Sequence, residues 1–233
     1  MFVTGESPSG SSYRSALLAV VCNQIGEKGV FALAMPVLEP DNSSMHVPAS
    51  DRWTAADLDH LPENGLRYEV VYGQLVVNAA AKPIHQLMVS QLGRILDSAL
   101  RDGLFMIPGV GVLIGDDEPI PDLLVCAGPV PWDERGIPAA QVVLAVEVVS
   151  RSTAAMDGRM KPDLYADGGI PNFWRIETNR FKGQLSSEEL PVLFAYALTE
   201  SGEYELVARC PAGRVAALNL PVDIAFDPAL LRP

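Results

Sequence analysis

The sequence predicts an α/β (α+β) protein with a mixed central β-sheet flanked by helices, in the element order αβββαβ. Three observations predict this class. Residues 85–100 have apolar side chains three and four positions apart, as one buried face of a helix requires. Apolar runs at 120–126 and 141–149 are typical of strands buried on both faces. A helical segment at 157–168 then precedes a strand at 172–178, which suits a crossover to a parallel neighbour.

The N-terminal part of the chain differs from the rest. Residues 1–50 are rich in Gly, Ser and Pro at their start and have no hydrophobic period towards their end. We expect them to form a poorly ordered extension, followed by one folded domain over 51–233. That domain opens with a capped helical turn at 54–60, and two strands at 67–72 and 74–78 flank a turn at Gly73.

The central elements follow in order. The helix at 85–100 leads into strands at 104–114, 120–126 and 141–149, which are expected to form an antiparallel meander. In the helix at 157–168, Pro162 fits only a first turn or a kink, so this boundary is the least defined. After the strand at 172–178, residues 190–217 alternate like a hairpin that turns at Ser201 and Gly202.

Composition excludes several classes of protein. The formal charge is −12, and residues 51–233 hold 15 basic and 25 acidic side chains for a charge of −10. This balance argues against a broad basic surface, so any phosphate-binding site must be local. No apolar stretch approaches the roughly 18 residues that cross a membrane. Three cysteines, none in a CxxC pair, suit reduced thiols. We expect a cytoplasmic protein with no membrane partner.

Glu147 is an acidic residue in a segment that is otherwise apolar. It lies inside the apolar run 141–149, where an isolated ionised carboxyl costs several kcal/mol. Asp122 supplies a second carboxylate at the start of the strand 120–126. If these strands pair antiparallel across the turn-rich segment 127–140, a symmetric pairing sets the two carboxylates side by side, with Cβ atoms roughly 4.5–5.5 Å apart. Like charges this close repel, and a divalent cation between them resolves the conflict.

Lys161, on the following helix, is the third candidate. Paired carboxylates suit Mg²⁺, with Mn²⁺ as a possible substitute, because hard cations prefer oxygen ligands. The ion lowers the pKa of a bound water, and a nearby ammonium orients that water or offsets charge on a phosphate. Such a set suits hydrolysis of a phosphodiester.

These residues stand within a series of motifs. They are LRYEVVYGQLVV at 66–77, PIHQ at 83–86, PIPDLLV at 119–125, VEVVSRST at 146–153, DGRMKPDLY at 157–165 and GIPNFW at 169–174. Together they resemble the Uma2 family of restriction-endonuclease-like proteins, in the PD-(D/E)XK nuclease superfamily. The resemblance covers roughly residues 52–180, and the motifs are specific only as a set.

The resemblance implies a restriction-endonuclease-like core and assigns roles within it. A metal would be held by Asp122, Glu147 and the backbone carbonyl of Val148, while Lys161 would position water and Glu69 would support the site. The chain departs from the parent motif because Val149, two residues after Glu147, replaces a lysine. Displacement of that lysine onto the next helix is usual in the narrower family.

Each of these candidates also has an ordinary structural interpretation. Glu147 would pair with an arginine, and Asp122 would be a turn residue after a proline. Lys161 would be solvated on its helix, and Glu69 would form a surface salt bridge.

Two further residues are candidates for substrate binding. His85 lies near a helix start, where a cap or a packing role is the common alternative. Arg159 is a candidate phosphate contact, although helix arginines are more often simply exposed.

The preferred interpretation is a cytoplasmic, Mg²⁺-dependent endonuclease that hydrolyses DNA phosphodiester bonds at a local binding site. A homodimer would suit the cutting of both strands of a duplex. The alternative is a catalytically silent nuclease-fold module that binds nucleic acid or a protein partner, because fold alone does not guarantee activity. A hydrolase for another class of phosphate ester is the third possibility.

Overall fold

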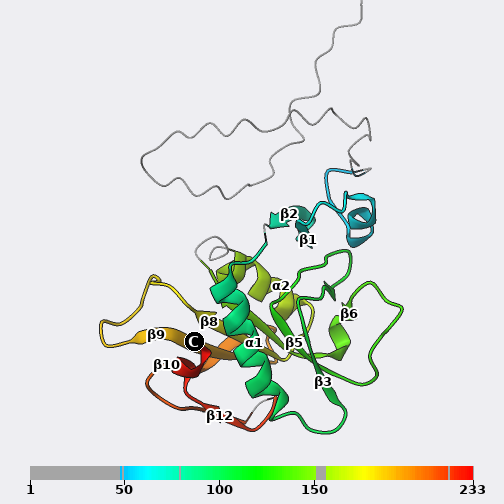
Figure 1. Cartoon of the computed structure of the whole chain (residues 1–233). Coiled ribbons are helices and arrows are strands. Elements are labelled where there is room, and N and C mark those ends of the chain that lie inside the picture. Colours follow the sequence, from blue (N-terminus) through cyan, green and yellow to red (C-terminus); the bar gives the residue numbers. More distant parts are fainter. Residues whose placement is uncertain (1–47, 49, 79, 151–155, 220, 233) are drawn as a thin grey trace, which may run out of the picture.

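A six-stranded mixed sheet forms the centre of the molecule (Figure 1), in the strand order β10-β9-β8-β7-β5-β3. The computed structural model describes residues 48, 50–78, 80–150, 156–219 and 221–232. The strands are β3 (Leu104–Pro108), β5 (Leu123–Ala127), β7 (Val142–Val149), β8 (Asn172–Glu177), β9 (Glu189–Leu198) and β10 (Tyr204–Ala212).

The directions of the strands confirm the predicted topology. β3, β5 and β7 form an antiparallel meander, and β8 is parallel to β7. β8, β9 and β10 are antiparallel in turn, and β9 and β10 form the predicted hairpin. The α+β class with a mixed sheet and flanking helices is therefore confirmed.

Each face of the sheet is covered by a helix. Helix α1 (Pro83–Asp97) begins two residues earlier than predicted, because proline is well suited to the first turn of a helix. Its buried side chains, Leu92 and Leu96 among them, pack on one face of the sheet. A π-helical turn, η3 (Met156–Met160), leads into helix α2 (Lys161–Asp167), whose Tyr165 packs on the other face. Pro162 lies in the first turn of α2, where its missing N–H costs no hydrogen bond.

A small ribbon of β1 (Arg67–Val71) and β2 (Gln74–Asn78) lies beside α2 (Figure 1). Its turn residues, Tyr72 and Gly73, have φ values of 52° and 72°, as a two-residue hairpin of type I′ requires. The hydroxyl of Tyr72 donates to Asp167 at 2.8 Å and ties the tip of the ribbon to the end of α2. This contact helps to position β1, and with it Glu69, relative to α2. Before the ribbon, the 3₁₀-helix η1 (Ala55–His60) has the capping box formed by Thr54 and Asp57.

The structure differs from the prediction in its short elements. The predicted strand 104–114 is interrupted after Pro108, and β4 (Val112–Leu113) pairs in parallel with β6 (Ile137–Pro138). Gly109 explains the break, since its φ of 63° lies in the left-handed region and ends the extended backbone. Beyond the hairpin, the strands β11 (Ala216–Leu218) and β12 (Ile224–Phe226) and the helix η4 (Pro228–Leu231) were not predicted, nor was the short η2 (Ala139–Gln141).

Some predictions fall outside the described residues or are only partly addressed. The prediction of a disordered extension over 1–50 lies almost wholly outside them, as does Cys22. Cys126 and Cys210 are buried free thiols, as expected. Among the described residues, no helix is long and apolar enough to span a membrane.

Candidate active site

The candidate carboxylates meet where β5 begins and β7 ends. The register pairs Leu123 with Val146, so Asp122, one residue earlier, stands opposite Glu147. The amide of Asp122 donates to the carbonyl of Val146 at 3.0 Å, which continues the ladder to this position. The opposed arrangement predicted from the symmetric pairing of the two strands is therefore confirmed.

Glu147 is nearly excluded from solvent, with 2% of its surface exposed. Its Oε1 accepts a hydrogen bond from the hydroxyl of Tyr165 at 2.6 Å and lies 3.2 Å from the Nζ of Lys161. Both partners come from α2, which follows β7 in the chain and folds back over the sheet. The crossover thus supplies one neutral donor and one cation to a carboxylate that the sheet alone would leave buried and unpaired.

Lys161 is buried at the start of α2, and its Nζ contacts oxygen atoms of several described residues. Its Nζ lies 2.9 Å from Oε2 of Glu69 and 3.8 Å from Oδ1 of Asp157, and it donates to the carbonyl of Ile120 at 3.1 Å. With Glu147, these groups come from four separate segments of the chain. The solvated interpretation of Lys161 does not hold, since its side chain is 6% exposed.

Glu69 enters the cluster from the β1–β2 ribbon and is 3% exposed. Its Oε2 accepts from the amide of Ile120 at 2.9 Å, and its Oε1 accepts from the side-chain amide of Asn78 at 2.8 Å. The surface salt bridge considered for Glu69 is therefore not what the structure contains. The residue instead bridges Lys161 to the segment that precedes Asp122.

His85, in the first turn of α1, contacts the same site. Its Nε2 is 3.2 Å from Oδ2 of Asp122 and 3.0 Å from the carbonyl oxygen of Val148. Both atoms are acceptors, so Nε2 carries the proton that they share. The amide of Val148 also donates to Oδ2 of Asp122 at 2.8 Å. The Nδ1 of His85 is buried and has no hydrogen-bond partner among the described residues.

Among the described residues, carboxyl groups outnumber basic groups within this site. The carboxyls of Glu69, Glu147 and Asp157 lie around one ammonium, that of Lys161, while Asp122 lies 3.2 Å from His85. Burial raises the pKa of Glu147 well above its usual value; Lys161 opposes this rise, and the nearby carboxylates reinforce it. Burial lowers the pKa of Lys161, but Glu147 and Glu69 outweigh this effect and keep the ammonium charged. For His85, burial likewise lowers the pKa, while the hydrogen bond and charge of Asp122 raise it above the ordinary value.

The oxygen atoms of this site include the donors that a divalent metal prefers. Within the described part of the chain, no three His, Cys, Asp or Glu side chains converge on one point as ligands. Two carboxylates, from Asp122 and Glu147, together with the carbonyl of Val148 nevertheless provide hard oxygen donors where β5 begins and β7 ends. A cation between the two opposed carboxylates would balance their charge. These residues therefore fit Mg²⁺, an ion that keeps several waters of its own.

Sequence reasoning missed three members of the site. Asp157 and Tyr165 flank Lys161 at spacings of four residues, which places all three on one side of the η3–α2 helix. That spacing was a usable signal. Asn78 had none, since its role depends on how the ribbon docks. In contrast, Arg159 is exposed, and the structure gives it no ion pair among the described residues.

Comparisons with known proteins identify the family and support the fold. A family model, Uma2, described as "Putative restriction endonuclease", matches residues 55–227. Among solved structures, the chain is similar to "a putative nuclease belonging to DUF820 from Anabaena variabilis", with 17% sequence identity and a TM-score of 0.54. That match covers 72% of this chain and 89% of the other, and at this identity it supports the fold alone. A search of curated proteins found no match.

Proposed function

The chain belongs to the Uma2 family, and on that premise we propose that it is a metal-dependent endonuclease that hydrolyses DNA phosphodiester bonds. The observation that carries the proposal is the opposed pair of carboxyls, Asp122 and Glu147, with Lys161 3.2 Å from Glu147. Like charges that stand opposite each other on neighbouring strands repel, and a divalent cation between them resolves the conflict.

The protein's residues divide into ligands and supporting groups. Asp122, Glu147 and the carbonyl of Val148 would hold Mg²⁺, or Mn²⁺ in its place. When bound, such an ion lowers the pKa of a water molecule and offsets negative charge on the phosphate. Tyr165 supports the ligand set, because its hydroxyl at 2.6 Å fixes the orientation of the Glu147 carboxylate.

Lys161 is the residue suited to position the attacking water. Its ammonium has three donors, and Glu69, Ile120 and Glu147 lie 2.9, 3.1 and 3.2 Å from it, so it would take up a water in exchange for its contact with Glu147 once that carboxylate holds a metal. Glu69 and Asp157 keep the ammonium charged and restrict its movement. His85 and Arg159 remain proposed substrate contacts, and only His85 lies directly at the carboxylates.

Cleavage of supercoiled plasmid DNA with Mg²⁺ tests the proposal. The wild-type protein should nick or linearise the plasmid, and the Asp122→Ala, Glu147→Ala double variant should lose this activity by at least ~10²-fold, as the loss of catalytic groups usually costs. The matched control replaces two exposed acids, Asp97→Ala and Glu205→Ala, and should cleave at the wild-type rate.

Three other outcomes would overturn or redirect the proposal. Cleavage that is unchanged in the Asp122→Ala, Glu147→Ala variant would sink it. DNA binding without cleavage by the wild type, across a range of duplex and single-stranded substrates, would instead favour the silent binding module. Hydrolysis restricted to small phosphodiesters would point to another class of phosphate ester.

A further inference from the structure

We propose that DNA docks on the sheet edge beside the candidate site, on a surface formed by residues 175–190 and 207–215, here termed the basic edge. The inference rests on the proposed nuclease function and deepens it, because it states which surface receives the DNA backbone.

Charge is distributed unevenly over the chain. The basic edge holds five basic and three acidic residues, whereas the remainder of residues 51–233 holds ten basic and twenty-two acidic ones. A phosphate backbone is attracted to local positive potential and repelled by the rest of such a molecule. Within this domain, the basic edge is therefore suited to receive the substrate.

A row of residues connects the basic edge to the carboxylates. Glu147 on β7 pairs with Arg175 on β8, Arg175 pairs with Phe194 on β9, and Phe194 pairs with Arg209 on β10. Residues paired in this way share a face of the sheet. Three strand spacings separate Glu147 from Arg209, about 15 Å, which corresponds to about four nucleotides along one strand of a duplex.

Aromatic rings and acids hold the two arginines of this row. The guanidinium of Arg175 lies 4.8 Å from the centre of the Phe194 ring and that of Arg209 lies 5.0 Å from it. Glu177 pairs with Arg175 at 3.2 Å, and Glu188 pairs with Arg209 at 2.6 Å. These contacts fix the two arginines as the floor of the surface, with much of their charge already matched.

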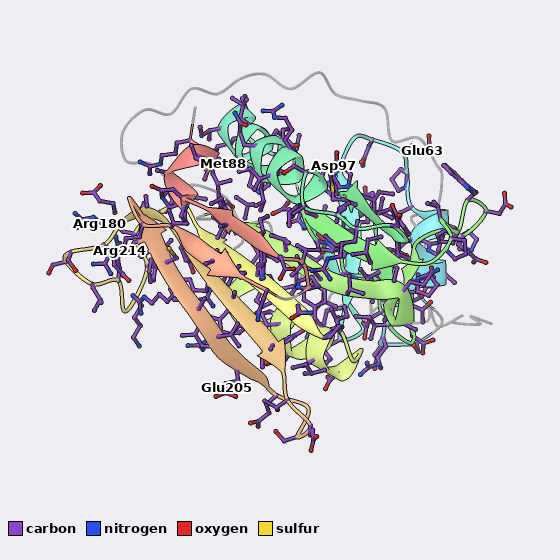
Figure 2. All side chains as sticks on the ribbon, turned by 90° about the horizontal axis from the view of Figure 1, so that it is seen from below. Glu63, Met88, Asp97, Arg180, Glu205 and Arg214 are labelled. Carbon is purple, nitrogen blue, oxygen red and sulfur yellow. The ribbon has the colours of Figure 1, made fainter. Side chains whose placement is uncertain are left out.

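Unmatched charge comes from Arg180, Lys182 and Arg214, which are exposed and have no ion pair among the described residues. They follow the C-terminal ends of β8 and β10, which run parallel to β7. All three residues therefore lie at the same end of the strands as the carboxylates. Figure 2 shows Arg180 and Arg214 together at one end of the β9–β10 hairpin and Glu205 at the other. The hairpin thus presents its basic end to the site and its acidic end away from it.

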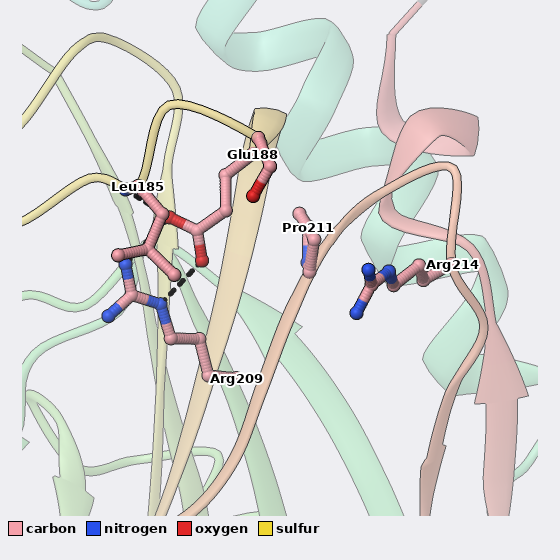
Figure 3. A pocket seen from close by; sticks show the side chains of 6 residues that line it. Leu185, Glu188, Arg209, Pro211 and Arg214 are labelled. Carbon is pink, nitrogen blue, oxygen red and sulfur yellow. Dashed lines mark hydrogen bonds and ion pairs between the residues drawn. The ribbon is translucent and has the colours of Figure 1, made fainter.

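A pocket of about 200 Å³ opens between Arg209 and Arg214 (Figure 3). Arg209 lies on one side of it, bonded to Glu188, and Arg214 extends its guanidinium towards it from the other side. Its remaining lining residues are Leu185, Ser187 and Pro211. One phosphate of a bound strand would fit here, with Arg214 as its charged partner.

The test measures binding of a fluorescein-labelled DNA duplex by anisotropy as salt is varied, in Ca²⁺, which takes oxygen ligands as Mg²⁺ does. The variant is Arg180→Ala, Lys182→Ala, Arg214→Ala. A matched control removes the same charge elsewhere, as Arg94→Ala, Arg101→Ala, Arg232→Ala. For the variant we expect a salt slope reduced by ~2–3 and affinity reduced ~10-fold or more near physiological salt. The control should stay close to wild type.

A second readout separates this inference from the proposed function. The variant should lose DNA cleavage in proportion to binding, yet hydrolyse bis(p-nitrophenyl) phosphate like wild type, because the carboxylates are untouched. If wild type cleaves DNA and the variant behaves like the control, the basic edge is wrong while the nuclease proposal stands. If wild type neither binds nor cleaves DNA, both fall together.

Discussion

The Nζ of Lys161 lies 3.2 Å from Oε1 of Glu147, and the two side chains are 6% and 3% exposed. Because water barely reaches either group, the charge of each is stabilised mainly by the other and by the protein atoms around them. The same ammonium also serves Glu69 and Asp157. One buried cation thus supports three carboxyls, which makes the site sensitive to any change of charge.

Replacing Lys161 should destabilise the metal-free protein. In Lys161→Met the stem is retained, but three buried carboxyls lose their counter-charge, and we expect a loss of ~3–5 kcal/mol in the free energy of unfolding. Urea denaturation measures it. Lys182→Met, which removes an exposed ammonium, is the control and should change stability little. Equal stabilities of the two variants would contradict the charge balance described for the site.

Tyr165→Phe tests whether the orientation of Glu147 matters for metal binding. The change removes the donor that lies 2.6 Å from the carboxylate, and a hydrogen bond to a charged group contributes ~1.5–3 kcal/mol. Tyr204→Phe is the control, since its hydroxyl donates to the carbonyl of Ile170 at 2.7 Å, outside the site. Both variants should be less stable than wild type, but only Tyr165→Phe should bind Mn²⁺ more weakly in calorimetry. Wild-type affinity in both would refute the role.

His85→Ala should strengthen metal binding. The Nε2 proton now lies between Oδ2 of Asp122 and the carbonyl of Val148, at 3.2 and 3.0 Å, and these are two of the oxygens assigned to the metal. Removal of the competing donor frees both, so the affinity for Mn²⁺ should rise several-fold. His85→Gln, which keeps a donor, should remain near wild type. Weaker binding by His85→Ala would instead mark the imidazole as a ligand.

The pair of Glu188 and Arg209 should produce a pH-dependent stability at the basic edge. The hydrogen bonds from Arg209 hold the pKa of Glu188 below its ordinary value of 4.5. Its contribution is therefore fully present above that value and is lost as the pH falls through the lowered pKa. Urea midpoints of wild type and Glu188→Gln should differ at pH 7 and converge in acid. A difference that persists unchanged in acid would contradict the pairing.

Periodicity and symmetry in the sequence were sufficient for much of the fold. The apolar spacing of α1 and the runs of β5 and β7 defined the core elements, and the symmetric pairing of the strands set Asp122 opposite Glu147. The short strands β4, β6, β11 and β12 could not be predicted in this way. Two or three residues contain no period, and their pairing depends on tertiary contacts.

Those site residues could be predicted whose neighbours in the sequence made their residue type unusual. Glu147 stood out because its apolar neighbours demanded a partner. The bridging of His85 to Asp122 and Val148 depends instead on how α1 docks on the sheet, and no local pattern encodes it. Asn78 likewise reaches Glu69 only through the pairing of the ribbon.

Calorimetric titration with Mn²⁺ and Mg²⁺, on wild type, Glu147→Ala and the exposed-acid control Glu205→Ala, tests the central claim most directly. The account predicts that wild type and Glu205→Ala bind the ion and that Glu147→Ala does not. Binding that is equal in all three proteins, or absent from all three even with DNA present, would contradict a metal site at Asp122 and Glu147.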